Sequence, residues 1–587
     1  MSNDAHSIAS TWLSTFSAGV ASGSVSGLAS LFLASGWLRE WLVFTWDLHT
    51  LDGVDKIGAF LKEKLPAAAI SDVRLVPDGA WGAEWLRPRY GAAFGLDFIE
   101  FGILAECAKG PVRGHVRLVH DVDGVHRALT VFTELQDLRA RIQEYVKAIE
   151  AKPYVLVVGS GQTGLNIASR LKQMNLPTLV IDKNPRVGDN WRKRYPSLTL
   201  HTINRHHSLL YQPYPSNWPL LTPRDKVADW LETYAQNQDI VVWTDTALQP
   251  GITYDAGARD APAVLRPAHI VLATGALGAP ITPALPGHEA FRGATVHSAS
   301  WAGTRAHPGA DGRVVVIGAG NSSIDICQDL ALEHAAAASD DGAQAHVRSV
   351  TMVQRSPTCV VSRDGVLEMQ KANWVEGARI ELGDFLSSAL PLHLLKRVAV
   401  ANQQAAWDAE RPLHDKLRKA GLKLWLGPEG QGQFLLVHER LGVSDLVSSW
   451  WAMPTDHAWL DKGGADLIEQ GLIKVKTGVE PVSFTEHGLL MSDGSEMEAD
   501  LVVFATGYRN MRDTNAALFG EGVIGKTEVA FGLDAEGESA AAYRPSGHPG
   551  LWFATGDFEV SRTRSKPLAM QLKAIQLGLL EHDGQRK

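Results

Sequence analysis

Residues 154–164 read Tyr154-Val-Leu-Val-Val158-Gly159-Ser-Gly161-Gln-Thr-Gly164. The apolar, β-branched run predicts a buried strand, and apolar positions between residues 165 and 171 predict a helix directly after the glycines. In such a turn the first glycine allows a sharp bend and the second lets the backbone approach a pyrophosphate. The third lets the helix and the strand pack closely. The order of strand, glycine turn and helix therefore predicts a dinucleotide site at a helix N-terminus.

An acid follows the next predicted strand at the position that such a site needs. Residues 178–181 form an apolar run that ends at Asp182, 18 residues after Gly164. A carboxylate there can accept hydrogen bonds from the hydroxyls of an adenosine ribose. We include Asp182 and the adjacent Lys183 among the predicted cofactor-binding residues.

A second strand, turn and helix begins at residue 313. The turn reads Gly318-Ala-Gly320-Asn321-Ser322-Ser323, so a serine replaces the third glycine. The strand after it ends at Arg355-Ser356 without an acid. An acid there would select NAD, whereas a guanidinium forks onto a ribose 2′-phosphate. We therefore predict NADPH at this second site; the alternative is that Arg355 is a solvated charge at a strand end.

Residues 1 to about 145 show a different pattern. We expect helices at 8–16 and near 28–32, a strand at 41–46, and a hairpin formed by 112–120 and 126–135. Helices followed by an antiparallel sheet indicate an α+β domain. The order resembles the cone-shaped NTF2-like (SnoaL-like) fold. Such a cone encloses a pocket, so four residues are either pocket-lining or ordinary core residues: Trp46, His49, Trp85 and Phe98. We expect this part to fold separately and to contribute no redox chemistry.

Three further motifs resemble the flavin-containing monooxygenases. The first, Gly188-Asp189-Asn190-Trp191, matches the glycine-rich segment that in this family follows the ribose acid and closes over the flavin. The second is the fingerprint from Phe291 through Gly293 and His297 to Trp301. The third is the loop 200–235, which is similar in order and spacing to the plant YUCCA branch.

The resemblance implies an α/β architecture with two Rossmann-like dinucleotide-binding domains after an α+β cone domain. An FAD domain contains an inserted NADPH domain, and the strands that end in Thr274-Gly275 and Thr506-Gly507 mark the passages between them. The expected ranges are 1–147 for the cone, 148–305 with 480–587 for FAD, and 306–479 for NADPH. Asp557, after Gly556, is expected to reach the ribityl phosphates, as in related two-dinucleotide flavoproteins.

The resemblance also suggests which residues lie at the reacting centre. Family members place an asparagine near the flavin edge; that position falls on His201 here, while Asn204 lies three residues on, and the choice between them is open. His297 is expected to orient the hinge between the domains. We take these three as the catalytic candidates.

The implied activity is that of an NADPH- and FAD-dependent monooxygenase. Such an enzyme inserts one oxygen atom of O2 into a small organic substrate through a C4a-hydroperoxyflavin, by N- or S-oxygenation or by oxidative decarboxylation of an α-keto acid. Trp301 is typical of Baeyer–Villiger enzymes, but Ala302 follows it where they usually carry Pro or Asp. Baeyer–Villiger insertion, and an NADPH-consuming flavin oxidase or sensor, are the alternatives.

Composition restricts the remaining possibilities. The net charge is -9 without a long basic run, so we expect no nucleic-acid partner. The three cysteines form no CxxC pair, which disfavours a dithiol redox centre and a cysteine metal site and suggests a reducing compartment. No signal peptide or membrane span is evident, so we expect a cytoplasmic protein. A homodimer is a candidate assembly.

Overall fold

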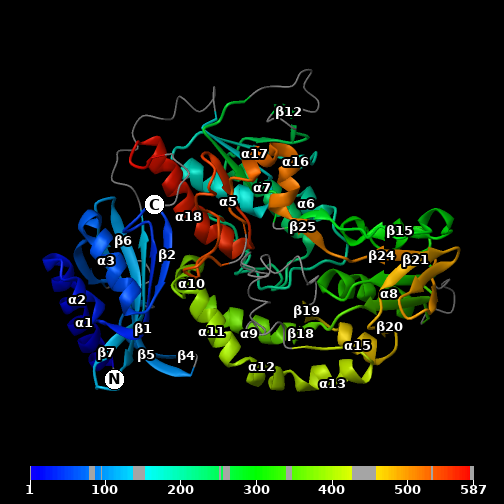
Figure 1. Cartoon of the computed structure of the whole chain (residues 1–587), viewed down its shortest axis with the longest axis horizontal. Coiled ribbons are helices and arrows are strands. Elements are labelled where there is room, and N and C mark those ends of the chain that lie inside the picture. Colours follow the sequence, from blue (N-terminus) through cyan, green and yellow to red (C-terminus); the bar gives the residue numbers. More distant parts are fainter. Residues whose placement is uncertain are drawn as a thin grey trace.

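The first glycine turn joins β8 (Val155–Val158) to α5 (Gln162–Gln173) in the computed structural model of the chain. The structure describes residues 2–77, 86–93, 95–136, 153–249, 253–255, 265–275, 277–338, 347–425, 458–530 and 533–581. Trp85 and most of the segment 136–151 lie outside these residues. Figure 1 shows the described elements as three neighbouring parts, with the N-terminal part in blue.

The N-terminal part is a sheet covered by helices. Its strand order is β2-β1-β7-β6-β5-β3, with β4 paired to β5; neighbouring strands are antiparallel except for the parallel pair of β1 and β7. The strands are β1 (Phe32–Trp41), β2 (Leu48–Asp52), β3 (Ser71–Leu75), β4 (Arg89–Ala93), β5 (Leu96–Glu106), β6 (Pro111–His120) and β7 (His126–Leu135). The helices are α1 (Ser2–Ser22), α2 (Val25–Ala29) and α3 (Val54–Ala68). The predicted hairpin is confirmed as β6 and β7.

The predicted strand at 41–46 is wrong, because β1 ends where that strand was placed. The chain instead turns at Leu42, which has a φ of 63°. The carboxylate of Glu40 holds this turn by accepting hydrogen bonds from the backbone N–H groups of Val43 and Phe44 at 2.8 and 3.2 Å. Phe32, expected in a helix, is the first residue of β1.

The second part is a parallel five-stranded sheet with the order β10-β9-β8-β13-β26. Its strands besides β8 are β9 (Thr178–Ile181), β10 (Val242–Trp243), β13 (His269–Leu272) and β26 (Leu551–Phe553). Its principal helices are α5, α6 (Asp189–Arg192), α7 (Arg224–Asn237), α16 (Met511–Phe519), α17 (Glu521–Ile524) and α18 (Phe558–Gln576). A small hairpin, β11 (Ala247–Gln249) with β12 (Thr253–Asp255), is attached to it. The predicted α/β fold class is confirmed by this sheet and the next one.

The third part is another parallel five-stranded sheet, with the order β15-β24-β16-β17-β20. Its strands are β15 (Ala294–His297), β16 (Arg313–Ile317), β17 (Ser349–Gln354), β20 (Ile473–Thr477) and β24 (Leu501–Phe504). The antiparallel strands β21 (Pro481–Thr485), β22 (Gly488–Met491) and β23 (Glu496–Glu498) form a meander beside it. Its first helix, α8 (Asn321–Ala338), follows the second glycine turn.

Short helices connect the third part back to the N-terminal part along the lower edge of Figure 1. They are α9 (Arg363–Asn373), α10 (Ile380–Ser388), α11 (Leu392–Ala401), α12 (Gln403–Ala409), α13 (Arg411–Lys419) and α15 (Gly464–Glu469). The parallel pair β18 (Cys359–Ser362) and β19 (Ala458–Asp461) lies among them. The described residues also include three 3-10 turns: His288–Ala290, Ser298–Ser300 and Thr304–Ala306.

The chain passes between the two parallel sheets at a pair of adjacent strands. β14 (Leu277–Pro280) follows Thr274-Gly275, β25 (Tyr508–Asn510) follows Thr506-Gly507, and the two strands pair antiparallel. The expected boundaries at 305/306 and 479/480 would divide the third part, since β15 and β24 belong to its sheet. We propose these paired passages as the division between the two dinucleotide-binding domains.

Candidate cofactor and active site

The three glycines of the first turn meet three different constraints. Gly159 has a φ of 109°, and a Cβ there would lie 2.5 Å from the carbonyl oxygen of Ala273. A Cβ on Gly164 would lie 1.9 Å from the carbonyl oxygen of Gly159. Gly161 precedes α5 and would meet only the side chain of Asn190, at 3.1 Å. The first and third glycines are therefore required by packing, whereas the second keeps the space beside the helix N-terminus clear.

This space suits the diphosphate of a dinucleotide. α5 begins without a side-chain cap, so its first N–H groups and its dipole favour an anion at this end. Asn190 comes from the Gly188–Trp191 segment, which therefore lies beside the turn. Gly188 has a φ of 91°, and a Cβ there would lie 2.4 Å from the carbonyl oxygen of Ala228 in α7, so only glycine lets α6 approach that helix.

Asp182 occupies the end of β9 but already has partners within the protein. One carboxylate oxygen accepts hydrogen bonds from the backbone N–H and the hydroxyl of Ser160, both at 2.7 Å. The other accepts from the backbone N–H and the side chain of Asn184 at 2.8 and 3.0 Å. Asp182 thus orders the glycine turn, and ribose hydroxyls would have to share its oxygens with Asn184. Lys183 is exposed and Asp189 is paired with Arg192 at 3.1 Å.

The start of α18 closes the other side of this site. Asp557 caps the helix by accepting a hydrogen bond from the N–H of Val560 at 3.0 Å, and Gly556 before it has a φ of 120°. The ring of Trp191 lies 6.1 Å from that of Phe558. The indole N–H of Trp191 is buried and has no hydrogen-bond partner among the described residues. Buried donors are normally satisfied, so this one marks a place where a ligand would supply an acceptor.

The second turn repeats the first with one chemical change. Gly318 has a φ of 123°, and a Cβ there would lie 2.3 Å from the carbonyl oxygen of Ala505. Ser323, which replaces the third glycine, donates a hydrogen bond from its hydroxyl to the carbonyl of Gly318 at 2.7 Å. The serine therefore bonds to the carbonyl that would exclude a larger apolar side chain.

The other predicted residues of the second site lie around this turn. The side-chain oxygen of Asn321 accepts a hydrogen bond from the N–H of Leu460 at 3.0 Å. Arg355 and Ser356 directly follow β17, whose Val353 accepts a hydrogen bond from the N–H of Gly318 at 3.0 Å. Arg355 forms an ion pair with Glu480 at 3.1 Å, and both side chains are about half exposed, at 46% and 51%. Arg355 thus lies two residues beyond the strand position that bonds to the turn, and its guanidinium is accessible.

His297 links the end of β15 to the second of the two passages. Its Nδ1 accepts a hydrogen bond from the N–H of Ala299 at 3.0 Å, so its Nε2 carries the proton that it shares with the carbonyl of Gly507 at 3.2 Å. Burial lowers the pKa of His297, which favours this neutral form. The hinge role of His297 stays a prediction. Trp301 is fully buried and stacks on His307 at 4.8 Å, within the core of the third part.

His201 and Asn204, the two candidates for the flavin edge, face different surroundings. Asn204 donates weakly from its side chain to the carbonyl oxygens of Trp218 and Pro219 at 3.5 and 3.4 Å. The Nε2 atom of His201 lies 3.5 Å from a carboxylate oxygen of Asp325, the fifth residue of α8. His201 therefore lies where the loop of the first site meets the first helix of the second site.

Asp325 is the centre of a buried polar cluster that sequence reasoning missed. It accepts a hydrogen bond from the hydroxyl of Tyr195 and forms an ion pair with Lys462 at 2.8 Å. Burial alone would raise the pKa of Asp325, but its contacts with His201 and Lys462 outweigh burial and hold that pKa at about 2. Asp325 lies two residues after Ser323, so its position next to the second glycine motif could have indicated it. No sequence motif indicates Lys462.

His206 is a second residue that the sequence did not single out. Its Nε2 lies 3.4 Å from a carboxylate oxygen of Asp557, and its ring lies edge-on to Trp374 at 4.8 Å. The carbonyl oxygen of His206 accepts a hydrogen bond from the guanidinium of Arg562 in α18. His206 is thus fixed beside the residue that we expect at the ribityl phosphates.

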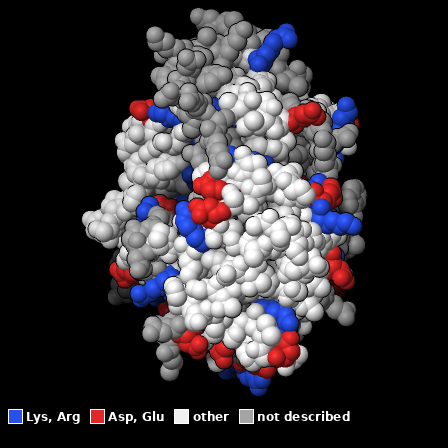
Figure 2. Space-filling model, turned by 90° about the vertical axis from the view of Figure 1, so that its left-hand side faces the viewer, with Lys and Arg blue, Asp and Glu red and all other residues white. Residues whose placement is uncertain are grey.

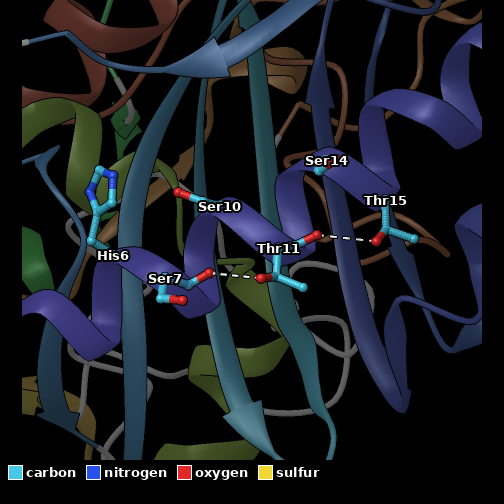
Figure 3. Close-up of a pocket in the computed structure, with 6 residues that line it drawn as sticks. All are labelled: His6, Ser7, Ser10, Thr11, Ser14 and Thr15. Atoms are coloured by element: carbon cyan, nitrogen blue, oxygen red, sulfur yellow. Dashed lines mark hydrogen bonds between the residues drawn. The ribbon is translucent and has the colours of Figure 1, made fainter.

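Other surface features do not contribute to this site. A shallow hollow on α1 is lined by His6, Ser7, Ser10, Thr11, Ser14 and Thr15, which follow one another along the helix (Figure 3). The hydroxyls of Thr11 and Thr15 donate to helix carbonyls at 2.9 and 3.1 Å. No group of side chains suited to a metal ion, and no helix long and apolar enough to cross a bilayer, occurs among the described residues.

The chain is similar in sequence to known flavoproteins. Residues 153–382 match the pyridine nucleotide-disulphide oxidoreductase family. Indole-3-pyruvate monooxygenase YUCCA1 of Oryza sativa subsp. japonica is 26% identical over 370 residues, which are 61% of this chain and 77% of that protein. Probable indole-3-pyruvate monooxygenase YUCCA4 of Arabidopsis thaliana is also 26% identical, over 61% of this chain and 76% of that protein. These matches support a relationship with the flavin monooxygenases.

Solved structures of flavin monooxygenases align with the chain at lower similarity. A flavin-containing monooxygenase from Stenotrophomonas maltophilia is 18% identical, with a TM-score of 0.43, and the alignment covers 72% of this chain and 98% of that chain. Cyclohexanone monooxygenase bound to ε-caprolactone is 16% identical, with a TM-score of 0.46, and the alignment covers 72% of this chain and 88% of that chain. The sequence relatives are flavin monooxygenases, which supports the expected resemblance and an enzyme of the flavin monooxygenase type.

Proposed function

We propose that the protein is an FAD- and NADPH-dependent monooxygenase that transfers one oxygen atom of O2 to a small organic substrate. The observation that carries this proposal is the contact between His201 and Asp325. It brings the loop 200–235 against α8, the helix that follows the second glycine turn. FAD belongs at the first turn, where Gly161 leaves the helix N-terminus clear, and NADPH at the second, beside Arg355. When bound, the nicotinamide supplies a hydride and the reduced flavin activates O2.

The residues of the chain then bind, orient and exclude water. The turns at Gly159 and Gly318 would hold the two diphosphates, and Asp557 would contact the ribityl part of FAD. The buried carboxylate of Asp325 orients His201 at the boundary between the sites. His297 donates to the carbonyl of Gly507 and so ties the end of β15 to the second passage. A site closed in this way excludes water from a reactive intermediate.

We rank unspecified monooxygenation of a nitrogen or sulfur centre first and oxidative decarboxylation of an α-keto acid second. The second gains support from the relatives whose names describe indole-3-pyruvate monooxygenases. Baeyer–Villiger insertion ranks third, and the burial of Trp301 gives it no support. A reaction on a soluble small molecule also agrees with Figure 2, where charges of both signs are scattered over the described part of the face without an extended basic field.

The test supplies NADPH and 18O2 with one probe at a time: an aryl pyruvate, a cyclic ketone or a methyl aryl sulfide. Incorporation of one labelled atom into a product, dependent on NADPH, supports the proposal and selects the reaction. The Gly161→Val protein serves as the control that should lack the flavin. If NADPH consumption is matched by hydrogen peroxide for every substrate in a broad panel, the protein is an oxidase or sensor and the proposal fails.

A further inference from the structure

A cavity of about 210 Å³ lies between the N-terminal sheet and the flavin-site part of the chain. Its walls come from β1, β6 and β7 on one side and from α5, α10 and α18 on the other. A water molecule takes about 30 Å³ of liquid volume, so the cavity has room for about seven water molecules or a small organic molecule. None of the residues predicted from the glycine motifs lines it.

Positive charge is in excess within this cavity. Arg113 of β6, Arg170 of α5 and Lys566 of α18 line it, together with Arg562. Arg562 is neutralised by Asp384 of α10 through two hydrogen bonds at 2.7 and 2.6 Å. The other three cations therefore depend on the two remaining carboxylates of the wall.

Those carboxylates are poorly placed for the three cations. Glu134 of β7 is shared: its oxygens lie 3.4 Å from Arg113 and 3.6 Å from Lys566. Glu381 of α10 is half exposed and lies 3.6 Å from Arg379 outside the cavity. Arg170 donates to the hydroxyl of Tyr211 at 2.8 Å and to the carbonyl of Arg562 at 3.2 Å, and neither group is charged.

The neighbouring cations affect the pKa of Lys566. Burial lowers the pKa of Lys566, Glu134 raises it, and the nearby Arg113 and Arg170 lower it further, which brings it to about 8. A second anion in the cavity would relieve this repulsion.

Trp41 supplies an independent sign of a missing acceptor. It lines the cavity, is only 2% exposed, and its indole N–H has no hydrogen-bond partner among the described residues. Leaving a buried donor without an acceptor costs free energy, and such donors are uncommon in folded proteins. Phe385 and Leu210 give the cavity apolar wall beside these polar groups.

We infer that this cavity binds a small organic carboxylate, with its charge between Lys566 and Arg170 and its apolar body against Phe385 and Leu210. A carboxylate oxygen would also accept from Trp41. The site differs from the flavin site, because Lys566 lies nine residues beyond Asp557, or about 13 Å along α18. An occupant would touch both the N-terminal sheet and α18 and so stabilise their contact. The inference does not depend on the monooxygenase reaction.

The test is calorimetric titration of the full-length, FAD-loaded protein with benzoate, with benzyl alcohol and inorganic phosphate as separate probes. Benzoate should bind, and Lys566→Met should weaken this binding by about ten- to a hundredfold, because a hydrogen bond to a charged group is lost. Lys573→Met is the matched control: it is buried on the same helix, bonds to Gln576 at 2.8 Å and does not line the cavity. Arg170→Gln should weaken the binding of benzoate by a similar factor to Lys566→Met.

A measurement without variants covers the case in which both substitutions disturb folding. Acetic anhydride should acetylate Lys566 in the native protein, and benzoate should protect it while leaving exposed lysines unaffected, as read by peptide mass spectrometry. The inference is overturned if benzoate does not bind, if binding is unchanged in both cavity variants, or if Lys566 is not protected. Equal binding of benzyl alcohol, or binding of phosphate alone, would also overturn the assignment to an organic carboxylate.

Discussion

Gly164 and Ser323 hold corresponding positions in the two glycine turns and meet the same constraint with different chemistry. Each lies against the carbonyl of the first glycine of its turn, Gly159 or Gly318. Gly164 avoids that oxygen by having no side chain, whereas Ser323 donates a hydrogen bond to it. A small residue is therefore needed at both positions, and the loss of one glycine leaves the nucleotide fold intact.

Gly161→Val separates flavin binding from folding. The new side chain would enter the space beside the α5 N-terminus and meet only Asn190, so we expect the protein to fold but to lose most of its FAD. The measurement is the ratio of flavin absorbance to protein after purification. Gly522→Val is the control, because nothing lies within 4 Å of a Cβ at Gly522. Full FAD occupancy in Gly161→Val would show that the diphosphate does not lie at this turn.

Arg355 should determine the preference for NADPH over NADH. Replacing it with alanine removes a charged contact to the 2′-phosphate that is worth about 1.5–3 kcal/mol, so we expect the ratio of kcat/KM for the two coenzymes to fall about ten- to a hundredfold. Glu480→Gln is the companion variant: it frees Arg355 from its ion pair and should preserve or increase the preference. Equal use of both coenzymes by the unmodified protein would contradict this role.

At the scale of elements, α18 carries ionisable groups from the flavin site to the N-terminal part. Glu559, in its first turn, is buried, and burial together with the nearby Asp557 and Asp384 raises its pKa to about 8. A carboxyl whose pKa is raised by folding stabilises the folded state fully below its unfolded pKa of about 4.3. That contribution is lost as the pH rises towards 8.

Glu559→Gln should therefore raise the melting temperature relative to the unmodified protein more at pH 8 than at pH 5, because glutamine resembles the protonated acid. Thermal melts at pH 5, 6.5 and 8 measure the difference. Glu232→Gln is the control with the opposite sign: Arg186 lowers the pKa of Glu232, so its contribution is lost only on acidification and the difference should stay flat over this range. A flat difference for Glu559→Gln would mean that Glu559 is ionised without cost in the folded protein.

β1 shows why some elements could not be predicted from the sequence, whereas the glycine turns could. Each glycine turn is specified by neighbours in the sequence, so its strand, turn and helix were readable together. In β1 the pairing with β7 shifts register between Phe32 and Trp37, which interrupts the alternation. Residues 37–41 are all buried because both faces of the strand are covered. Arg39 and Glu40 read as surface charges, yet the partner of Arg39 is Glu538, 499 residues away.

Separation along the sequence also limits how much of the site could be predicted. The glycines, Asp182 and Arg355 belong to local motifs, so the sequence alone indicates them as candidates. His206 and Lys462 reach the site only through tertiary packing, so no local spacing indicates them. The cavity under Trp41 is formed by strands and helices from opposite ends of the sequence, and its charges resemble ordinary solvated residues until the sheet and α18 are brought together.

At the scale of the whole molecule, the N-terminal part shares a core with the rest of the chain. Buried side chains of the N-terminal sheet form one cluster with residues of α10 and α18: Leu382, Phe385, Ala389, Met570 and Ala574. Charged side chains cross the same contact. Arg544 binds both carboxylate oxygens of Asp47 at 2.8 and 3.0 Å, and His49 lies 2.9 Å from Glu536. Figure 1 shows α18 and α10 next to the N-terminal sheet.

Glu538 should be the most sensitive charge in this contact. It is fully buried between Arg39 at 2.9 Å and Arg564 at 2.7 Å. Glu538→Gln would leave both arginines without their anion, which costs about 3–5 kcal/mol. Glu536→Gln should cost about 0–1 kcal/mol, because the Glu536 side chain, which pairs with His49, is 37% exposed. Urea unfolding of both variants gives the comparison, and similar losses for the two would contradict the role assigned to Glu538.

Removal of residues 1–147 should therefore destabilise the remaining flavin monooxygenase rather than release an independent domain. The shortened chain would expose Phe385 and Met570, and Glu538 would lose Arg39 and Thr50, two of its buried partners. Because Asp557 caps α18, loosening of this helix should also weaken the hold on FAD. We expect a lower melting temperature, stronger binding of a hydrophobic dye and incomplete FAD content, each measured against the full chain. If residues 148–587 retain the melting temperature and the full FAD content of the intact protein, the N-terminal part is an independent domain and its shared core contributes little to stability.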